Sequence, residues 1–231
     1  MTNGLFITST GTDIGKTFVT CAMLHQLFRQ HVQVEAIKPV ASGVVAGDPE
    51  SDPARLLRAM GRPHHQSAIN DICPWRYKQA VAANLAAAAQ GESIPWPKLL
   101  HFCQRKLNTP SLTLVEGAGG LMSPINDTKT VIDLIQELSL PAIMVAGNYL
   151  GSISHTLTAI ETLSNHRIPL VGLVICESQE PAIEQHQFEQ LIFNRQMDAL
   201  PLIWIPRNSD KSDAYKFVPS LETLWINSLN S

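Results

Sequence analysis

The sequence lacks the features that mark membrane proteins and nucleic-acid-binding proteins. No apolar run approaches the ~18 residues that a membrane-spanning helix requires. The formal net charge is -3 and the sequence pI is near 6.2, so the chain has no excess of basic residues to attract a polyanion. We therefore expect neither a membrane nor a nucleic acid as a partner, and any phosphate must be bound by a local motif.

Cysteine pairs with metal-binding or redox spacing are also missing. Cys21, Cys73, Cys103 and Cys176 are scattered with no C-x-x-C pair, and three of them lie in apolar surroundings typical of reduced, buried thiols. The sequence runs straight into an apolar segment, with no basic region or cleavage site ahead of it. These features predict a cytoplasmic protein.

Linkers, internal repeats and low-complexity segments are absent, which favours one domain over residues 1–231. The composition is 45% hydrophobic, enough for a large core. Apolar strands alternate with helical patterns, which predicts an α/β fold with a mostly parallel sheet and helices on both faces. The expected strands are 5–7, 34–40, 112–116, 142–146, 170–175 and 202–205, and the expected helices are 18–27, 51–60, 80–89, 95–107, 130–138, 151–165, 181–193 and 219–226, with 61–75 irregular.

Residues 9–17, Ser-Thr-Gly-Thr-Asp-Ile-Gly-Lys-Thr, lie between the first expected strand and the first expected helix. In that position, loop and helix N–H groups converge on one point and attract an anion. In a P-loop, the lysine of Gly-Lys-Thr, here Lys16, reaches the β- and γ-phosphates, and the hydroxyl, here of Thr17, binds Mg²⁺. Thr10 replaces the first glycine of the usual motif. The loop predicts a P-loop NTPase-like fold.

Charged residues end two of the expected strands, at the sheet edge where ligands bind in open α/β folds. Lys38 precedes Pro39 and is interpreted equally well as a ligand-binding lysine or a solvated strand end. Glu116 precedes a Gly-Ala-Gly-Gly turn, and a carboxylate buried there requires Mg²⁺ or a lysine as its partner. An exposed glutamate on a glycine-rich turn is the alternative.

Three other polar segments allow both a structural and a functional interpretation. Asp52 is a suitable N-cap before Pro53, yet its position also suits a magnesium-linked role. The small hydroxyl residues after Gly151 suit either a simple helix cap or a bound carboxylate. His64 and His65 are expected at the surface, because no further ligand stands at a metal-site spacing.

Three motifs together resemble the dethiobiotin synthetase family over nearly the whole chain. They are the Thr-x-x-Gly-Lys-Thr loop at 12–17, Lys-Pro-Val-Ala-Ser-Gly at 38–43 and Val-Glu-Gly-Ala-Gly-Gly at 115–120. The resemblance implies a cytoplasmic, homodimeric, ATP-dependent ligase of biotin biosynthesis. In its reaction CO₂ and 7,8-diaminononanoate form a carbamate, which attacks the γ-phosphate of ATP. The second amine then closes the ring of dethiobiotin and expels phosphate.

The resemblance also implies roles for individual residues. Lys16 and Lys38 would be catalytic cations, and Thr17, Asp52 and Glu116 would surround Mg²⁺. ATP would contact Thr12, Asp13, Ile14, Gly15, Lys16, Thr17, Asp52, Glu116, Gly117, Ala118, Gly119, Cys176 and Pro206. The substrate would contact Thr12, Lys38, Ser42, Gly151, Ser152 and Ser154.

Some positions depart from the family pattern. Asn84 lies in an Ala-Asn pair where the family commonly has Pro-His, and Ser154 stands where asparagine is frequent. Cys176 stands where the family often has an asparagine that reads adenine. A thiol is a weak donor and acceptor, so we expect loose selection of the base unless main-chain groups near Pro206 read it.

Two alternative functions remain within the same fold. A regulatory ATPase of the partitioning or division-site type shares a deviant phosphate loop, but usually has a second lysine near the loop start and often a membrane-binding tail. Here the loop start has no lysine, and the expected last helix has little basic charge. A non-catalytic paralogue of the synthetase is the other alternative, motivated by Asn84 and Ser154.

Overall fold

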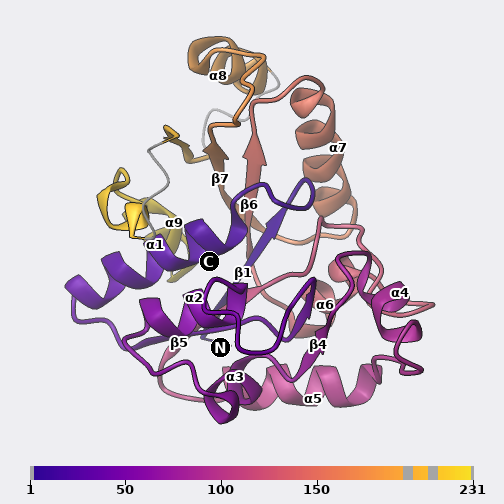
Figure 1. Ribbon diagram of the computed structural model, residues 1–231. Helices are drawn as coiled ribbons and strands as arrows, with labels where there is room; N and C mark the ends of the chain where they lie inside the picture. Colours follow the sequence, from indigo (N-terminus) through magenta and orange to yellow (C-terminus); the bar gives the residue numbers. More distant parts are fainter. Residues whose placement is uncertain (1–2, 195–199, 208–212, 230–231) are drawn as a thin grey trace.

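Six parallel strands form the central sheet of the computed structural model, in the order β2-β5-β1-β6-β7-β8 (Figure 1). The structure describes residues 3–194, 200–207 and 213–229. The strands are β1 (Gly4–Ser9), β2 (Val34–Ile37), β5 (Leu112–Glu116), β6 (Ala142–Gly147), β7 (Leu170–Cys176) and β8 (Leu202–Ile205). β1, β5 and β6 are buried along their whole length, as expected where helices cover both faces.

Helices cover the two faces of this sheet. α1 (Lys16–Arg29) links β1 to β2 and α7 (Ser152–Asn165) links β6 to β7, in opposite directions across the sheet. Because such connections are right-handed, the two helices lie on opposite faces. α5 (Trp96–Leu107) and α6 (Val131–Leu138) pack against each other, and α9 (Glu222–Leu229) contacts β7. Because the six strands are parallel, their carboxyl ends lie at the same edge of the sheet.

A small second sheet forms after Pro39. β3 (Val40–Ser42) pairs in parallel with β4 (Trp75–Tyr77), and α4 (Ala83–Ala88) packs on both strands. Proline has no N–H for a strand ladder, and the expected strand 34–40 is divided there into β2 and β3. This division leaves Lys38 between two sheets, next to the edge where the phosphate loop lies.

The expected fold class, a P-loop NTPase-like α/β domain, is confirmed, but several elements differ from expectation. The segment 61–75 is not irregular: it contains α3 (Gln66–Ile72) and the start of β4. Ser51, not Asp52, is the N-cap of α2 (Asp52–Ala59). α8 (Gln185–Phe193) begins later than expected, as do α4 and α9, and the 3₁₀ helix η1 (Ala214–Phe217) was not expected. In the described part of the chain, no helix is long and apolar enough to cross a membrane.

Candidate active site

The loop between β1 and α1 has a shape that depends on glycine at two places. Gly15 adopts a φ of 105°, a left-handed conformation, and a Cβ there would lie 2.8 Å from Sγ of Cys176. A Cβ on Gly120 would lie 3.2 Å from the Gly11 backbone. The loop is therefore packed between the glycine-rich turn after β5 and the end of β7.

Lys16 begins α1 and points back into the loop. Its ammonium group donates to Oγ of Ser9 at 3.0 Å and to the carbonyl of Gly11 at 3.1 Å. Burial, together with the positive charge of Lys38, lowers the pKa of Lys16 from 10.5 to about 8. Its partners within the described residues are neutral, so its charge is available to an anion.

A buried charge cluster lies beside the loop at the ends of β2 and β5. The Lys38 ammonium donates to Oε1 of Glu116 at 2.7 Å and also to the carboxylate of Asp52. The Lys38 and Glu116 side chains are 6% and 0% exposed, whereas the Asp52 side chain is 39% exposed. Glu116 is thus buried and paired with a lysine, one of the two partners that its strand-end position predicts.

Lys38 and Asp52 stabilise each other's charged form. Burial by itself lowers the pKa of Lys38, but the carboxylates of Glu116 and Asp52 outweigh it, and that pKa is raised. Burial opposes ionisation of Asp52, but the charge of Lys38 and its hydrogen bond lower the pKa of that carboxyl. Lys38 is therefore a fixed cation near neutral pH, in contrast to Lys16.

The arrangement fits a divalent cation as well. Oγ1 of Thr17 donates to Oε1 of Glu116 at 2.6 Å, while Oε2 of Glu116 is buried without a hydrogen-bond partner in the described structure. A hydroxyl and two carboxylates are oxygen ligands of the kind that Mg²⁺ prefers. Within the described residues, no group of three or more His, Cys, Asp or Glu forms a metal site. Such a small ligand set suits Mg²⁺, which is commonly held by one or two carboxylates together with substrate phosphates.

Two adjoining cavities extend along this sheet edge. The smaller has a volume of about 240 Å³ and contains most of the predicted phosphate and substrate residues: Thr12, Asp13, Gly15, Lys16, Thr17, Lys38, Ser42, Asp52, Ala118 and Gly119. The larger, of about 890 Å³, runs from Ile14 and Gly15 to Cys176 and Pro206. The phosphate loop thus connects a charged compartment with a larger one at the ends of β7 and β8.

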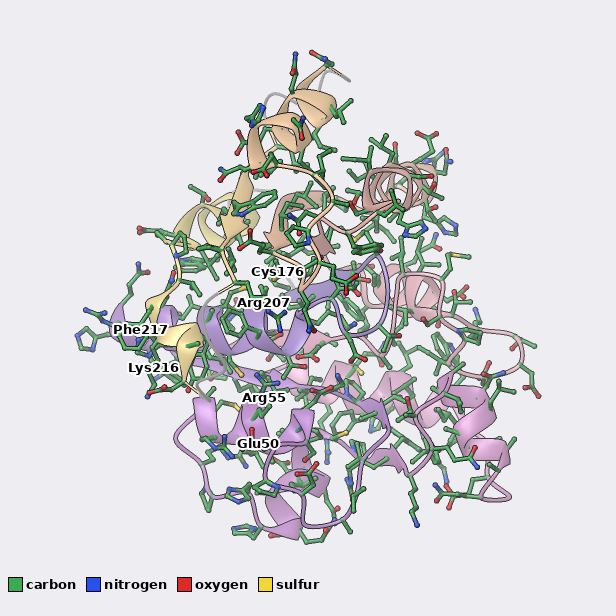
Figure 2. All side chains as sticks on the ribbon, turned by 45° about the horizontal axis from the view of Figure 1, so that its top comes forward. Glu50, Arg55, Cys176, Arg207, Lys216 and Phe217 are labelled. Atoms are coloured by element: carbon green, nitrogen blue, oxygen red, sulfur yellow. The ribbon has the colours of Figure 1, made fainter. Side chains whose placement is uncertain are left out.

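The sequence-based prediction missed several polar residues of these cavities, among them Arg55 and Glu177. Arg55 lines both cavities, and its guanidinium makes no hydrogen bond or ion pair with the described residues. All four of Arg55, Glu50, Cys176 and Arg207 line the larger cavity, and Figure 2 shows the first two on one side of it and the last two on the other. One signal for Arg55 was present, because it follows Asp52 by three residues and thus shares its helix face. Glu177 lines the larger cavity just after β7, and its sequence position alone gave no signal.

The predicted carboxylate-binding residues lie elsewhere. Gly151 precedes α7 with a φ of 91°, Ser152 is buried with its hydroxyl unpartnered among the described residues, and Ser154 is exposed. None of the three is among the residues lining the two cavities. Gly117 is also outside the lining, and a Cβ added there would lie 3.0 Å from the ring of Phe6.

The chain is similar to known proteins over most of its length. A family model described as an AAA domain matches residues 3–204. An ATP-dependent dethiobiotin synthetase BioD from Caulobacter vibrioides (strain NA1000 / CB15N) is 43% identical over 185 residues, which cover 78% of this chain and 83% of that protein. The protein of the same name from Caulobacter sp. (strain K31) is 42% identical over 207 residues, covering 88% of this chain and 87% of that protein.

Solved structures with low identity share the fold. A ParA family ATPase from Chlorobium tepidum TLS has a TM-score of 0.53 at 12% identity, with 100% of this chain and 95% of that chain covered. The septum site-determining protein MinD from Pyrococcus horikoshii OT3, complexed with Mg-ADP, has a TM-score of 0.52 at 14% identity, with 96% and 89% covered.

Proposed function

Because the chain belongs to the family of ATP-dependent dethiobiotin synthetases, we propose that it converts 7,8-diaminononanoate, CO₂ and ATP to dethiobiotin, ADP and phosphate. The observation that carries the proposal is the convergence of Lys16, Lys38 and Thr17 on one small cavity at the sheet edge. Phosphoryl transfer depends on positioning and on cations more than on a covalent nucleophile. This cavity offers those cations.

The steps of the reaction match the charges available. One amine of the substrate adds to CO₂ and loses a proton, which gives an anionic carbamate. The carbamate oxygen attacks the γ-phosphorus as the bond to ADP breaks, forming a carbamic-phosphoric anhydride. The second amine then attacks the carbonyl carbon and phosphate leaves. Lys16 neutralises charge on the transferring phosphoryl group, and Lys38 holds the carbamate in line with it.

Other residues position the reactants. Thr17, Asp52 and Glu116 would hold Mg²⁺, which when bound neutralises and orients the phosphates. Thr12, Asp13, Ile14 and Ala118 belong to the loops around the phosphates, and Ser42 contacts the substrate. Arg55 adds a further cation to the nucleotide site, since it lines both cavities.

The remaining parts of the proposal concern assembly. The substrate carboxylate binds at the start of α7, at Gly151, Ser152 and Ser154 of the partner subunit in a homodimer. The position of these residues outside the two cavities supports a contribution from a second copy. The protein acts in the cytoplasm, as the scattered spacing of its cysteines predicts.

A regulatory ATPase is the second candidate, because the ParA and MinD structures share the fold. The deciding experiment measures phosphate release from ATP with and without diaminononanoate and bicarbonate, and detects dethiobiotin by mass spectrometry. We expect phosphate in proportion to the diamine, and none above background with Lys16→Ala. ATP hydrolysis that ignores the diamine would favour the regulatory ATPase, and no turnover by a protein that binds nucleotide would favour the non-catalytic paralogue.

A further inference from the structure

Glu177 lines the larger cavity and joins the ends of β7 and β8. Its N–H donates to the carbonyl of Ile205 at 2.9 Å. Its Oε2 accepts from the N–H of Arg207 at 2.8 Å. These bonds occupy the Ile205 carbonyl and the Arg207 amide, the two main-chain groups on either side of Pro206. The side chain of Glu177 is thereby held in one orientation.

Two polar side chains beside Glu177 are occupied as well. Asn148 is buried, its Oδ1 accepts from the N–H of Ser178 at 2.7 Å, and its Nδ2 donates to the carbonyl of Ile183 at 3.0 Å. The hydroxyl of Ser178 accepts from the N–H of Asn148 at 3.1 Å. Reading a base with these groups would break the turn after β7. Cys176 contributes only a weakly polar thiol.

The second carboxylate oxygen of Glu177, in contrast, is free within the described structure. Oε1 has no hydrogen-bond partner among the described residues, and Glu177 is half-buried in the cavity lining. A carboxylate only accepts hydrogen bonds, so this oxygen pairs with a donor and is repelled by an acceptor. Adenine and cytosine carry an exocyclic amino group at the position where hypoxanthine and uracil carry a carbonyl oxygen.

We propose that Glu177 determines base specificity. It selects bases that carry an amino group at this exocyclic position, adenine and cytosine, over those that carry a carbonyl oxygen there, hypoxanthine and uracil. The proposal rests on the proposed function, in which this cavity binds a nucleoside triphosphate. Cys176 alone predicts loose selection of the base, and Glu177 would add a preference for amino over oxo bases. ATP and CTP satisfy the free oxygen, whereas ITP and UTP leave it facing a carbonyl.

The anchor on Arg207 makes one substitution especially informative. In Glu177→Gln, the N–H of Arg207 still needs an oxygen, so the amide oxygen takes that place and the NH₂ group turns toward the base. The variant then offers a donor where the wild type offers an acceptor. We expect its preference to invert, toward IDP over ADP and UDP over CDP.

The test measures dissociation constants of these four diphosphates with Mg²⁺ and no diamine. Wild type should bind ADP and CDP at least about tenfold more tightly than IDP and UDP, because an unpaired buried polar group is costly. Glu180→Gln is the matched control, since it removes the same charge from the lining of the same cavity without an anchored orientation. Its ratios should stay within about twofold of wild type.

Equal affinity for amino and oxo diphosphates in wild type would overturn the proposal. Unchanged ratios in Glu177→Gln would overturn it too, as would the same inversion in Glu180→Gln. Because the readout is binding without turnover, it is separable from the proposed reaction. A protein that shows the preference but makes no dethiobiotin would contradict the proposed function alone, and a synthetase without the preference would contradict only the role of Glu177.

Discussion

At the scale of single residues, Lys16 differs from an ordinary lysine because its pKa is about 8 rather than 10.5. The nucleotide-bound state needs the protonated form, so affinity is full below that pKa and falls as the pH rises through it. We expect ADP affinity to fall about tenfold between pH 7 and pH 9, measured by equilibrium titration. In Lys16→Arg the guanidinium stays charged, so whatever affinity remains should not change with pH. A flat wild-type profile would show that Lys16 does not titrate there.

Lys38 combines catalysis with stability. Lys38→Ala should lose most of kcat with a smaller effect on ATP binding, because its contact strengthens as the carbamate attacks. The substitution also leaves Glu116 buried and without its lysine, which should cost about 3–5 kcal/mol in urea unfolding. Lys38→Arg keeps the charge and should retain more stability while still losing turnover. If only the KM for ATP rises, Lys38 is a nucleotide ligand and the proposed role is wrong.

At the scale of elements, the sequence predicted the helices and strands that are recognisable from their own residues. The expected strands 112–116 and 202–205 match β5 and β8, and a parallel sheet brings strand-end residues such as Lys38 and Glu116 to one edge. The segment 61–75 was missed because α3 is short and is capped by a histidine, with Nδ1 of His65 accepting from the N–H of Ala68 at 3.2 Å. β4 exists only through its pairing with β3, a tertiary contact.

The residues of α2 differ in whether they face the cavities. Asp52 and Arg55 share a face toward the cavities, whereas Arg58 pairs with Glu50 at 3.0 Å. Arg55→Ala should weaken ADP binding by roughly tenfold or more, the cost of one hydrogen bond to a charged group. Arg58→Ala, on the same helix, is the control and should change affinity by less than about twofold. Equal effects of both substitutions would mean that α2 as a whole, rather than Arg55, supports the nucleotide.

At the scale of the whole molecule, the proposed substrate site requires two copies of the chain. Leu150, beside the start of α7, is 89% exposed in the single chain, which suits burial against a second copy. We expect a dimer in sedimentation at working concentration. A diamine lacking the carboxylate should bind much more weakly than diaminononanoate. A monomer, or equal affinity for the two compounds, would contradict the role of Gly151, Ser152 and Ser154.

The buried thiols can report where the protein unfolds locally. Cys21, Cys73 and Cys103 are at most 1% exposed, and burial raises the pKa of each to about 12. Alkylating reagents attack the thiolate, so these side chains should stay unmodified in the closed protein at neutral pH. Cys21 belongs to α1, Cys73 lies between α3 and β4, and Cys103 belongs to α5. The order in which the three become labelled in dilute urea would therefore show which layer over the sheet separates first.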